Sequence, residues 1–205
     1  EPVAVRSIGP DLVYGRLSRE SGLPAILGNL LEGRRYEFDV ERAVYLTVLH
    51  RLIAPGSDRA AERWREDYRI PLTEALELQH LYRAMAWLGE PIEGEESLPG
   101  SPRCTKDRIE EALFDRGRDL FSGVDVVFFD TTSIYFEGEG GATLGQRGHS
   151  KDSRPDLKQM IVGIAMDAAG KPLCCEMWPG NTADAKTLLP VVERMRKRFR
   201  IREVG

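Results

Sequence analysis

The chain has 205 residues, of which 41% are hydrophobic and 30% charged, a composition typical of a globular protein with one or two domains. No apolar run reaches the ~18 residues that a membrane-spanning helix needs, and the first residues lack the layout of a signal peptide, so we expect a cytoplasmic protein without membrane contact. The net charge of −4 is uneven: residues 1–122 hold 17 basic against 22 acidic side chains, residues 123–205 hold 12 against 11, and a polyanionic partner should therefore contact mainly the second part.

Helical spacing dominates the first half of the chain. Apolar residues recur at intervals of three and four over residues 40–53, where Asp39 is placed to cap the first turn and a Pro-Gly pair ends the pattern. A short helix near residues 60–64 and another over 78–88 are predicted next. The pattern indicates an all-helical region over residues 1–104, with a linker at about 89–104 rich in Gly, Pro and Glu. Its helices could bind DNA, support oligomerisation or simply pack together.

Over residues 105–205 the sequence pattern changes from that of a connecting helix to that of strands, and then back to that of a helix. Helical spacing begins again after residue 105, and β-branched and aromatic residues then predict a strand near 124–136 and two more on either side of the turn "DAAG". The almost unbroken apolar run 161–166 is typical of a central strand covered on both faces. A helix follows, in which Pro190 either lies in the first turn or causes a kink, and a fourth strand begins near the end. The fold class is therefore mixed α/β.

Cysteine spacing predicts no metal site and no disulfide framework. Cys104, Cys174 and Cys175 lack the C-x-x-C spacing of a zinc site, and two adjacent cysteines of a strand point to opposite faces. Buried small side chains are the expected role.

Asp130 is the residue of greatest chemical interest. In "VDVVFFDTTSIYFEG", residues 124–138, it follows four apolar residues directly. A carboxylate on a buried strand is costly unless it is paired, hydrogen-bonded or open to a cleft. One alternative is an Asp that accepts hydrogen bonds from the region of Thr131 and Thr132; the other is a metal ligand or a nucleophile. Phosphohydrolases that form an aspartyl-phosphate need a second Asp where this chain has Thr132, so that function is a minor alternative.

Basic residues gather in the loop that follows this strand. "LGQRGHSKDSRPDLK", residues 144–158, suggests contacts to DNA phosphates, and the alternative is a solvated loop in which Asp152 pairs with Arg154. A second basic run, "RMRKRFRIR", is expected on the solvent side of the last helix, where it is either an ordinary solvated face or a DNA contact. The candidate DNA-binding residues of the loop are Arg147, His149, Lys151, Arg154 and Lys158.

Five segments in order resemble the DDE transposases of bacterial insertion sequences: "FDVERAVYLTVLHRL", "HLYRAMAWL", "FFDTTSIYFEGEG", "GHSKDSRPDLKQMIVGIAMD" and "PGNTADAKTLL". The resemblance implies a helical region followed by the first part of an RNase H-like catalytic domain. It also implies transposition by metal-dependent DNA cleavage and strand transfer, with two Mg²⁺ or Mn²⁺ ions. The implied partners are transposon ends, target DNA and further copies of the chain in a synaptic complex, within a bacterial cytoplasm and its nucleoid.

Asp130 matches the first of the three catalytic acids of that family. The second Asp is expected shortly beyond "IREVG" and the Glu much later, so residues 1–205 hold one acid of the triad. We therefore expect a fragment that is inactive alone, because two metal ions would lack most of their ligands. The remaining alternative is a non-catalytic remnant that binds DNA or associates with the complete enzyme.

Overall fold

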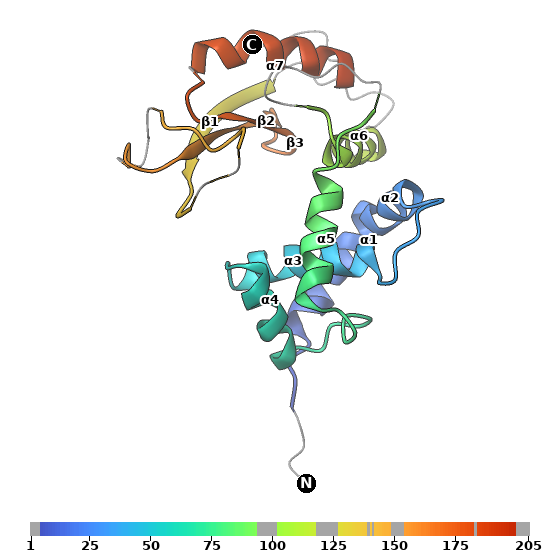
Figure 1. Cartoon of the computed structure of the whole chain (residues 1–205). Coiled ribbons are helices and arrows are strands. Elements are labelled where there is room, and N and C mark those ends of the chain that lie inside the picture. The colour runs from blue at the N-terminus through green and yellow to red at the C-terminus, as the bar shows by residue number, and fades with distance from the viewer. Residues whose placement is uncertain are drawn as a thin grey trace. The chain divides into compact units, whose positions relative to one another are not determined.

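The computed structural model describes residues 5–93, 102–117, 127–138, 140, 142–148, 154–182 and 184–199. The chain divides into two compact units, Glu1–Glu90 and Pro91–Gly205, and each is described by itself. The described residues form seven α-helices and one three-stranded antiparallel sheet (Figure 1), which confirms the mixed α/β class. None of the helices in these ranges is long and apolar enough to span a membrane. The division between the units, after Glu90, falls at the start of the predicted linker of residues 89–104. The predicted domain boundary at residue 104 stays a prediction.

The first unit is helical, and its three predicted helices are confirmed. Asp39 accepts a hydrogen bond from the Arg42 amide at 3.0 Å, and Ser57 caps the next helix in the same way. The elements are η1 (Asp11–Gly15, a π-helical turn), α1 (Arg16–Ser21), α2 (Leu23–Leu30), α3 (Val40–Ile53), α4 (Asp58–Trp64), η2 (Arg65–Asp67, a 3₁₀ turn) and α5 (Leu78–Leu88). The core lies between α3 and α5, where Leu46, Leu49, Leu81 and Ala84 are fully buried.

The second unit is a sheet with a helix at one edge and a helix on one face. Its elements are α6 (Thr105–Gly117), β1 (Val127–Tyr135), β2 (Gln159–Asp167), β3 (Pro172–Pro179) and α7 (Asp184–Phe199). The strand order is β1-β2-β3, and both pairings are antiparallel. Asp167 closes the predicted β2–β3 turn, because its Oδ1 accepts hydrogen bonds from the amides of Ala169 and Lys171.

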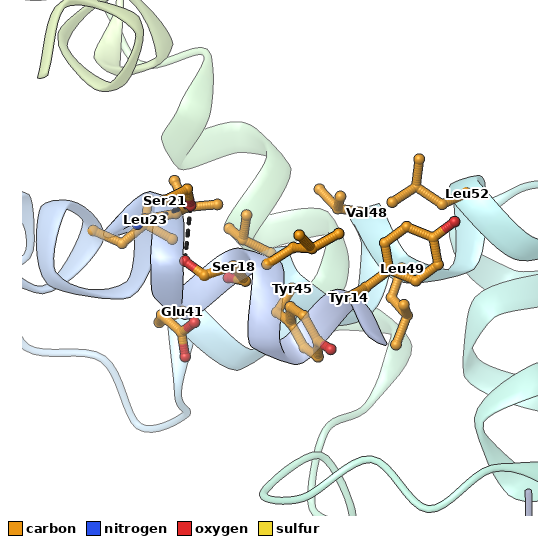
Figure 2. A pocket seen from close by; sticks show the side chains of 12 residues that line it. Tyr14, Ser18, Ser21, Leu23, Glu41, Tyr45, Val48, Leu49 and Leu52 are labelled. Carbon is orange, nitrogen blue, oxygen red and sulfur yellow. Dashed lines mark hydrogen bonds between the residues drawn. The ribbon is translucent and has the colours of Figure 1, made fainter. Parts of the chain in front are cut away.

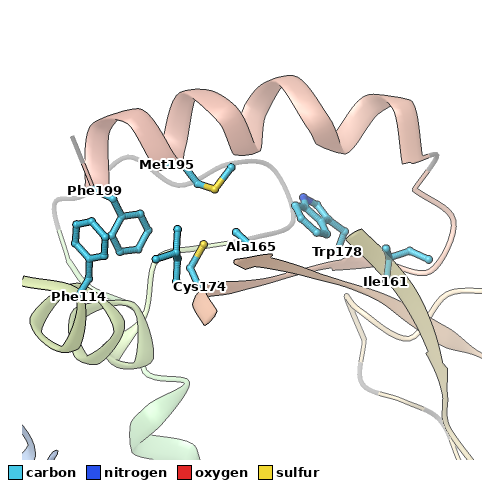
Figure 3. Close-up of a cluster of buried hydrophobic side chains, with 8 residues drawn as sticks. Phe114, Ile161, Ala165, Cys174, Trp178, Met195 and Phe199 are labelled. Atoms are coloured by element: carbon cyan, nitrogen blue, oxygen red, sulfur yellow. The ribbon is translucent and has the colours of Figure 1, made fainter. Parts of the chain in front are cut away.

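Helix α7 covers one face of the sheet (Figure 3). Its side chains Met195 and Phe199 belong to one cluster of buried side chains with Ile161 and Trp178 of the sheet and Phe114 of α6. The rings of Phe114 and Phe199 meet edge to face with centroids 4.9 Å apart. This cluster is the hydrophobic core of the second unit.

Helix α6 closes the outer edge of β3 with side chains. The Cys175 amide donates to Glu110 Oε1 at 2.9 Å, and Lys106 Nζ donates to the Cys175 carbonyl at 2.5 Å. An edge strand presents backbone groups that could pair with another strand. Here the side chains of Glu110 and Lys106 on α6 form hydrogen bonds with the amide and the carbonyl of Cys175.

A buried ion network ties α6, β3 and α7 together, and sequence analysis did not identify it. Arg198, whose side chain is only 2% exposed, contacts Glu110 at 2.7 Å, Glu111 at 2.8 Å and Glu176 at 3.0 Å. Arg194 lies 3.0 Å from the second oxygen of Glu176. The buried ion network comprises Lys106, Asp107, Glu110, Glu111, Glu176, Arg194 and Arg198.

Burial and neighbouring charges act in opposite directions on the carboxyl groups of the network. Burial by itself raises the pKa of Asp107, but Lys106 and Arg198 outweigh it and hold the pKa below its ordinary value. Burial raises the pKa of Glu176 above its ordinary value, and the opposing effect of the two arginines is smaller.

Three structural expectations need correction. The basic run of the last helix does not lie wholly on the solvent side, because Arg194 and Arg198 point into the unit. Of the two alternatives for Pro190, a place in the first turn of α7 is wrong, since the helix already begins at Asp184. The apolar strand β2 is not covered on both faces by the described residues, because Ile164 is 40% exposed. The expected fourth strand lies outside the described residues.

We predict that Arg198→Ala lowers the free energy of unfolding of the second unit by about 3–5 kcal/mol, because several buried carboxylates lose their cation. Arg196→Ala, two residues away on the exposed side of α7, should change it by less than ~0.5 kcal/mol. Urea unfolding of the full chain measures both variants. Equal losses for the two would show that the network contributes nothing specific.

Candidate functional site

Asp130 lies in the middle of β1, opposite Ile164 of β2. Successive side chains of a strand point to opposite faces. Phe129 packs against the core under α7, so Asp130 lies on the other face of the sheet, where its side chain is exposed. Sequence analysis placed Asp130 on a buried strand, but in the described part of the chain β1 pairs only with β2 and forms an edge of the sheet.

The surroundings of Asp130 are open to solvent and mostly apolar, with Thr132 as a polar neighbour on the same face. Phe128, Ile134 and Ile164 share its face by the same alternation, and each is between 40 and 56% exposed. Among the described residues, nothing covers these four side chains fully. A carboxylate there keeps its hydration and stays available to a cation or a donor.

The structure shows one hydrogen bond to the Asp130 carboxylate, and its donor is the next residue of the chain. Oδ1 of Asp130 accepts from the amide of the next residue, Thr131, at 2.8 Å. This contact matches the structural alternative of an Asp that binds the backbone beside it. It leaves the second carboxylate oxygen without a hydrogen bond from the described residues.

A metal centre is not complete in the described ranges. No group of three His, Cys, Asp or Glu side chains lies close enough together there to hold an ion. Carboxylate oxygens suit Mg²⁺ and Mn²⁺, but a pair of ions ~3.5–4 Å apart needs several such ligands. Asp130 alone therefore does not fit the two-ion centre that the sequence resemblance implies.

The basic loop is anchored by two glycines at the far end of β1. Gln146 and Gln159 exchange two backbone hydrogen bonds of 3.0 Å, and the Gly180 amide donates to the Leu144 carbonyl. A Cβ on Gly148 would collide with the carbonyl of Gly180, so the two backbones meet where only glycine fits. The signals for this contact were the glycines of "QRG" and "PGN", to which sequence analysis assigned no structural role.

Arg154 of the loop and Asp130 are not brought together. Tyr135, beside the loop, is five residues along β1 from Asp130, which is roughly 16 Å at ~3.3 Å per residue. Arg147, Arg154 and Lys158 are described, and Arg147 and Arg154 are exposed. His149 and Lys151 lie outside the described residues.

Arg154 has a local acidic partner. Its guanidinium donates to both carboxylate oxygens of Asp156, at 3.0 and 2.9 Å, and lies over the ring of Tyr135 at 5.6 Å. The ion pair holds the pKa of Asp156 below its ordinary value. Asp152, the partner that the sequence suggested, lies outside the described residues. Part of the charge of Arg154 is therefore neutralised within the loop.

The cysteines offer no nucleophile. Cys104 and Cys174 are buried, as predicted, whereas Cys175 is half-buried, and all three are free thiols. Burial raises the pKa of Cys174 to about 12 and also raises the pKa values of Cys104 and Cys175.

Comparison of the chain with protein-family models, with curated proteins and with solved structures found no match. The resemblance to transposases is therefore not shown by these comparisons and stays a prediction.

We predict that Asp130→Ala changes the free energy of unfolding by less than about 1 kcal/mol, since the side chain is exposed and loses one local hydrogen bond. Ala165→Asp places a carboxylate on the covered face of β2 and should cost several kcal/mol. Thermal and urea unfolding compare the two variants. A large loss in Asp130→Ala would mean that the residue is structural and that the face assignment is wrong.

Proposed function

We propose that this chain is part of a DDE-type DNA transposase: a helical region followed by the start of an RNase H-like catalytic domain, with Asp130 as one catalytic acid. The observation that carries the proposal is the position of Asp130, a solvent-open carboxylate in the middle of a strand among apolar neighbours. A carboxylate that only stabilises the fold does not have to be held on a rigid strand. A carboxylate that binds a group at a reacting centre does, because its position must be fixed.

The order of elements supports the same proposal. A helical unit precedes three antiparallel strands, the first of which holds the acid, and a long helix then covers the opposite face. The sequence resemblance implies this order for an RNase H-like domain. Transposon ends and target DNA, further copies of the chain and a location at the bacterial nucleoid belong to the proposal as well.

Asp130 would contribute carboxylate oxygens to a divalent ion, whose chemistry is to activate a nucleophile and stabilise the leaving oxygen of a phosphodiester. Since the described residues do not hold such a centre, we derive no catalytic step from them. The same observation favours a second candidate function, a non-catalytic piece that binds DNA or associates with other copies.

The basic loop supports DNA as the partner. The exposed guanidinium groups of Arg147 and Arg154 lie on a loop whose backbone is held by the Gly148–Gly180 contact. An anchored loop loses less conformational freedom on binding than a loose one, so its phosphate contacts would be stronger.

Arg154→Gln should weaken DNA binding and reduce the slope of log affinity against log salt by about one phosphate contact. Asp156→Asn removes the carboxylate that pairs with Arg154, so it should strengthen binding and steepen that slope. Fluorescence anisotropy with a labelled duplex, measured from about 50 to 200 mM salt, reports both effects.

Glu20→Gln, which removes an exposed carboxylate paired with Arg16 in the first unit, is the matched control for Asp156→Asn. If Arg154→Gln and Asp156→Asn both leave the affinity and its salt dependence at the wild-type values, the loop does not contact DNA.

The 205-residue chain should show no Mg²⁺- or Mn²⁺-dependent DNA cleavage, because one carboxylate does not hold two ions. A chain extended by the residues encoded after Gly205 should cleave transposon-end DNA and should lose this activity in the Asp130→Asn variant. Gel assays of nicked and joined products measure both. Metal-dependent cleavage by the short chain that Asp130→Ala abolishes would contradict the first expectation, and an active extended Asp130→Asn chain would refute the catalytic role.

A further inference from the structure

Tyr135 is the last residue of β1 and is partly open to solvent beside the basic loop, with 37% of the residue exposed. Its backbone is held in place, because it pairs with Gln159 of β2, which in turn exchanges two backbone hydrogen bonds with Gln146 of the loop. The strand therefore presents an aromatic side chain at a fixed position next to basic residues.

The guanidinium of Arg154 lies over this ring, with its central carbon 5.6 Å from the ring centroid. Asp156 accepts hydrogen bonds from the same guanidinium at 3.0 and 2.9 Å, and such a fork fixes its orientation. The side chain of Arg154 is 47% exposed. Two planar groups, a phenol ring and a guanidinium, thus lie together within reach of a ligand, and we call them the Tyr135–Arg154 pair.

A similar pair in the first unit is buried. Arg42 lies over the ring of Tyr45 at 4.6 Å and pairs with Glu41, beside the apolar groove between the helical segment 11–30 and α3 (Figure 2). The side chain of Arg42 is only 17% exposed, and Tyr45 is 5% exposed. A buried pair of this kind contributes to packing, whereas the Tyr135–Arg154 pair is accessible to a ligand.

The charges around the exposed pair reduce what Arg154 contributes to a phosphate contact. Its hydrogen bonds to Asp156 chiefly, and the charge of Arg147 to a smaller extent, hold the pKa of Asp156 below its ordinary value. Asp156 is therefore ionised at neutral pH and weakens the attraction of Arg154 for a phosphate. The ion pair lies in the plane of the guanidinium, so it does not prevent the planar face from stacking. Arg147, which is exposed near the same carboxylate, adds a second cation.

The faces of bases are accessible in single strands but not in a continuous duplex. In duplex DNA each base is stacked between its neighbours, and a protein reaches base edges and phosphates. Unpaired bases stack on aromatic rings and on the planes of arginine side chains. The Tyr135–Arg154 pair therefore has the chemistry that recognises an unpaired base.

We propose that the Tyr135–Arg154 pair stacks an unpaired base, so that the basic loop binds DNA with a single-stranded segment more tightly than a continuous duplex. The inference rests on the proposed function, because it takes DNA as the partner, and it goes further by naming the form of the DNA. Arg147 contacts a phosphate of the same strand. Stacking selects no particular base, since every base has a face of this kind.

Fluorescence anisotropy of the full chain compares a labelled blunt duplex with the same duplex carrying an unpaired extension of about five nucleotides. The wild type should bind the extended duplex at least about fivefold more tightly. Tyr135→Ala should abolish this difference. Its affinity for the blunt duplex and the salt dependence should stay at the wild-type values, because the ring carries no charge. Tyr135→Phe keeps the ring and should bind like the wild type.

Tyr36 supplies the matched control. It lies under Arg83, which pairs with Glu37, but it is half-buried and belongs to the more acidic part of the chain. Tyr36→Ala should therefore keep the wild-type preference. Circular dichroism verifies that the variants are folded. Tyr135→Leu, which keeps apolar volume without a planar ring, replaces Tyr135→Ala if that variant does not fold.

The emission of 2-aminopurine placed in the extension reports stacking directly: the wild type should quench it and Tyr135→Ala should not. Equal affinity of the wild type for the two duplexes, or a folded Tyr135→Ala that keeps the preference, overturns the inference. The proposed function stands in that case if Arg154→Gln still weakens binding to the blunt duplex. A chain that binds neither duplex overturns both.

Discussion

The second unit depends on the buried cation of Arg198. Its guanidinium contacts carboxylates of both α6 and β3, so it joins α7 to the preceding strand and to a helix much earlier in the sequence. Ions are costly to bury, and each of these charges is tolerated only because the others are present. The network therefore acts as a constraint on geometry: α6 must lie along the edge of β3, and α7 must lie on the face from which Glu176 points.

That constraint decides which part of the sheet stays open. With α7 on one face and α6 at the β3 edge, the face that holds Asp130 is the one that the described residues leave exposed. Register is equally decisive, because a slip of one residue would turn Asp130 into the core and Phe129 to solvent. The hydrogen bond to Thr131 and the open position are compatible with each other, since a carboxylate has a second oxygen for another partner.

The two units expose apolar surface of different kinds. In the second unit the apolar neighbours surround a carboxylate, and in the first unit the polar groups of the groove are mostly paired internally. A surface of the first kind suits chemistry on a charged substrate, whereas the groove offers few polar groups to such a substrate.

The sequence by itself determined the helices 40–53 and 78–88, the three strands and the candidate acid, because caps, periodicity and turn residues act locally. It missed the helices between residues 11 and 30, where glycines and a proline interrupt the apolar pattern. Only the tertiary structure decided that Arg194 and Arg198 are buried, that Gly148 meets Gly180, and that Asp130 faces away from α7. Each of these outcomes depends on partners 18 or more residues away. Spacing along the chain does not show which distant carboxylate or backbone group will lie beside a given residue.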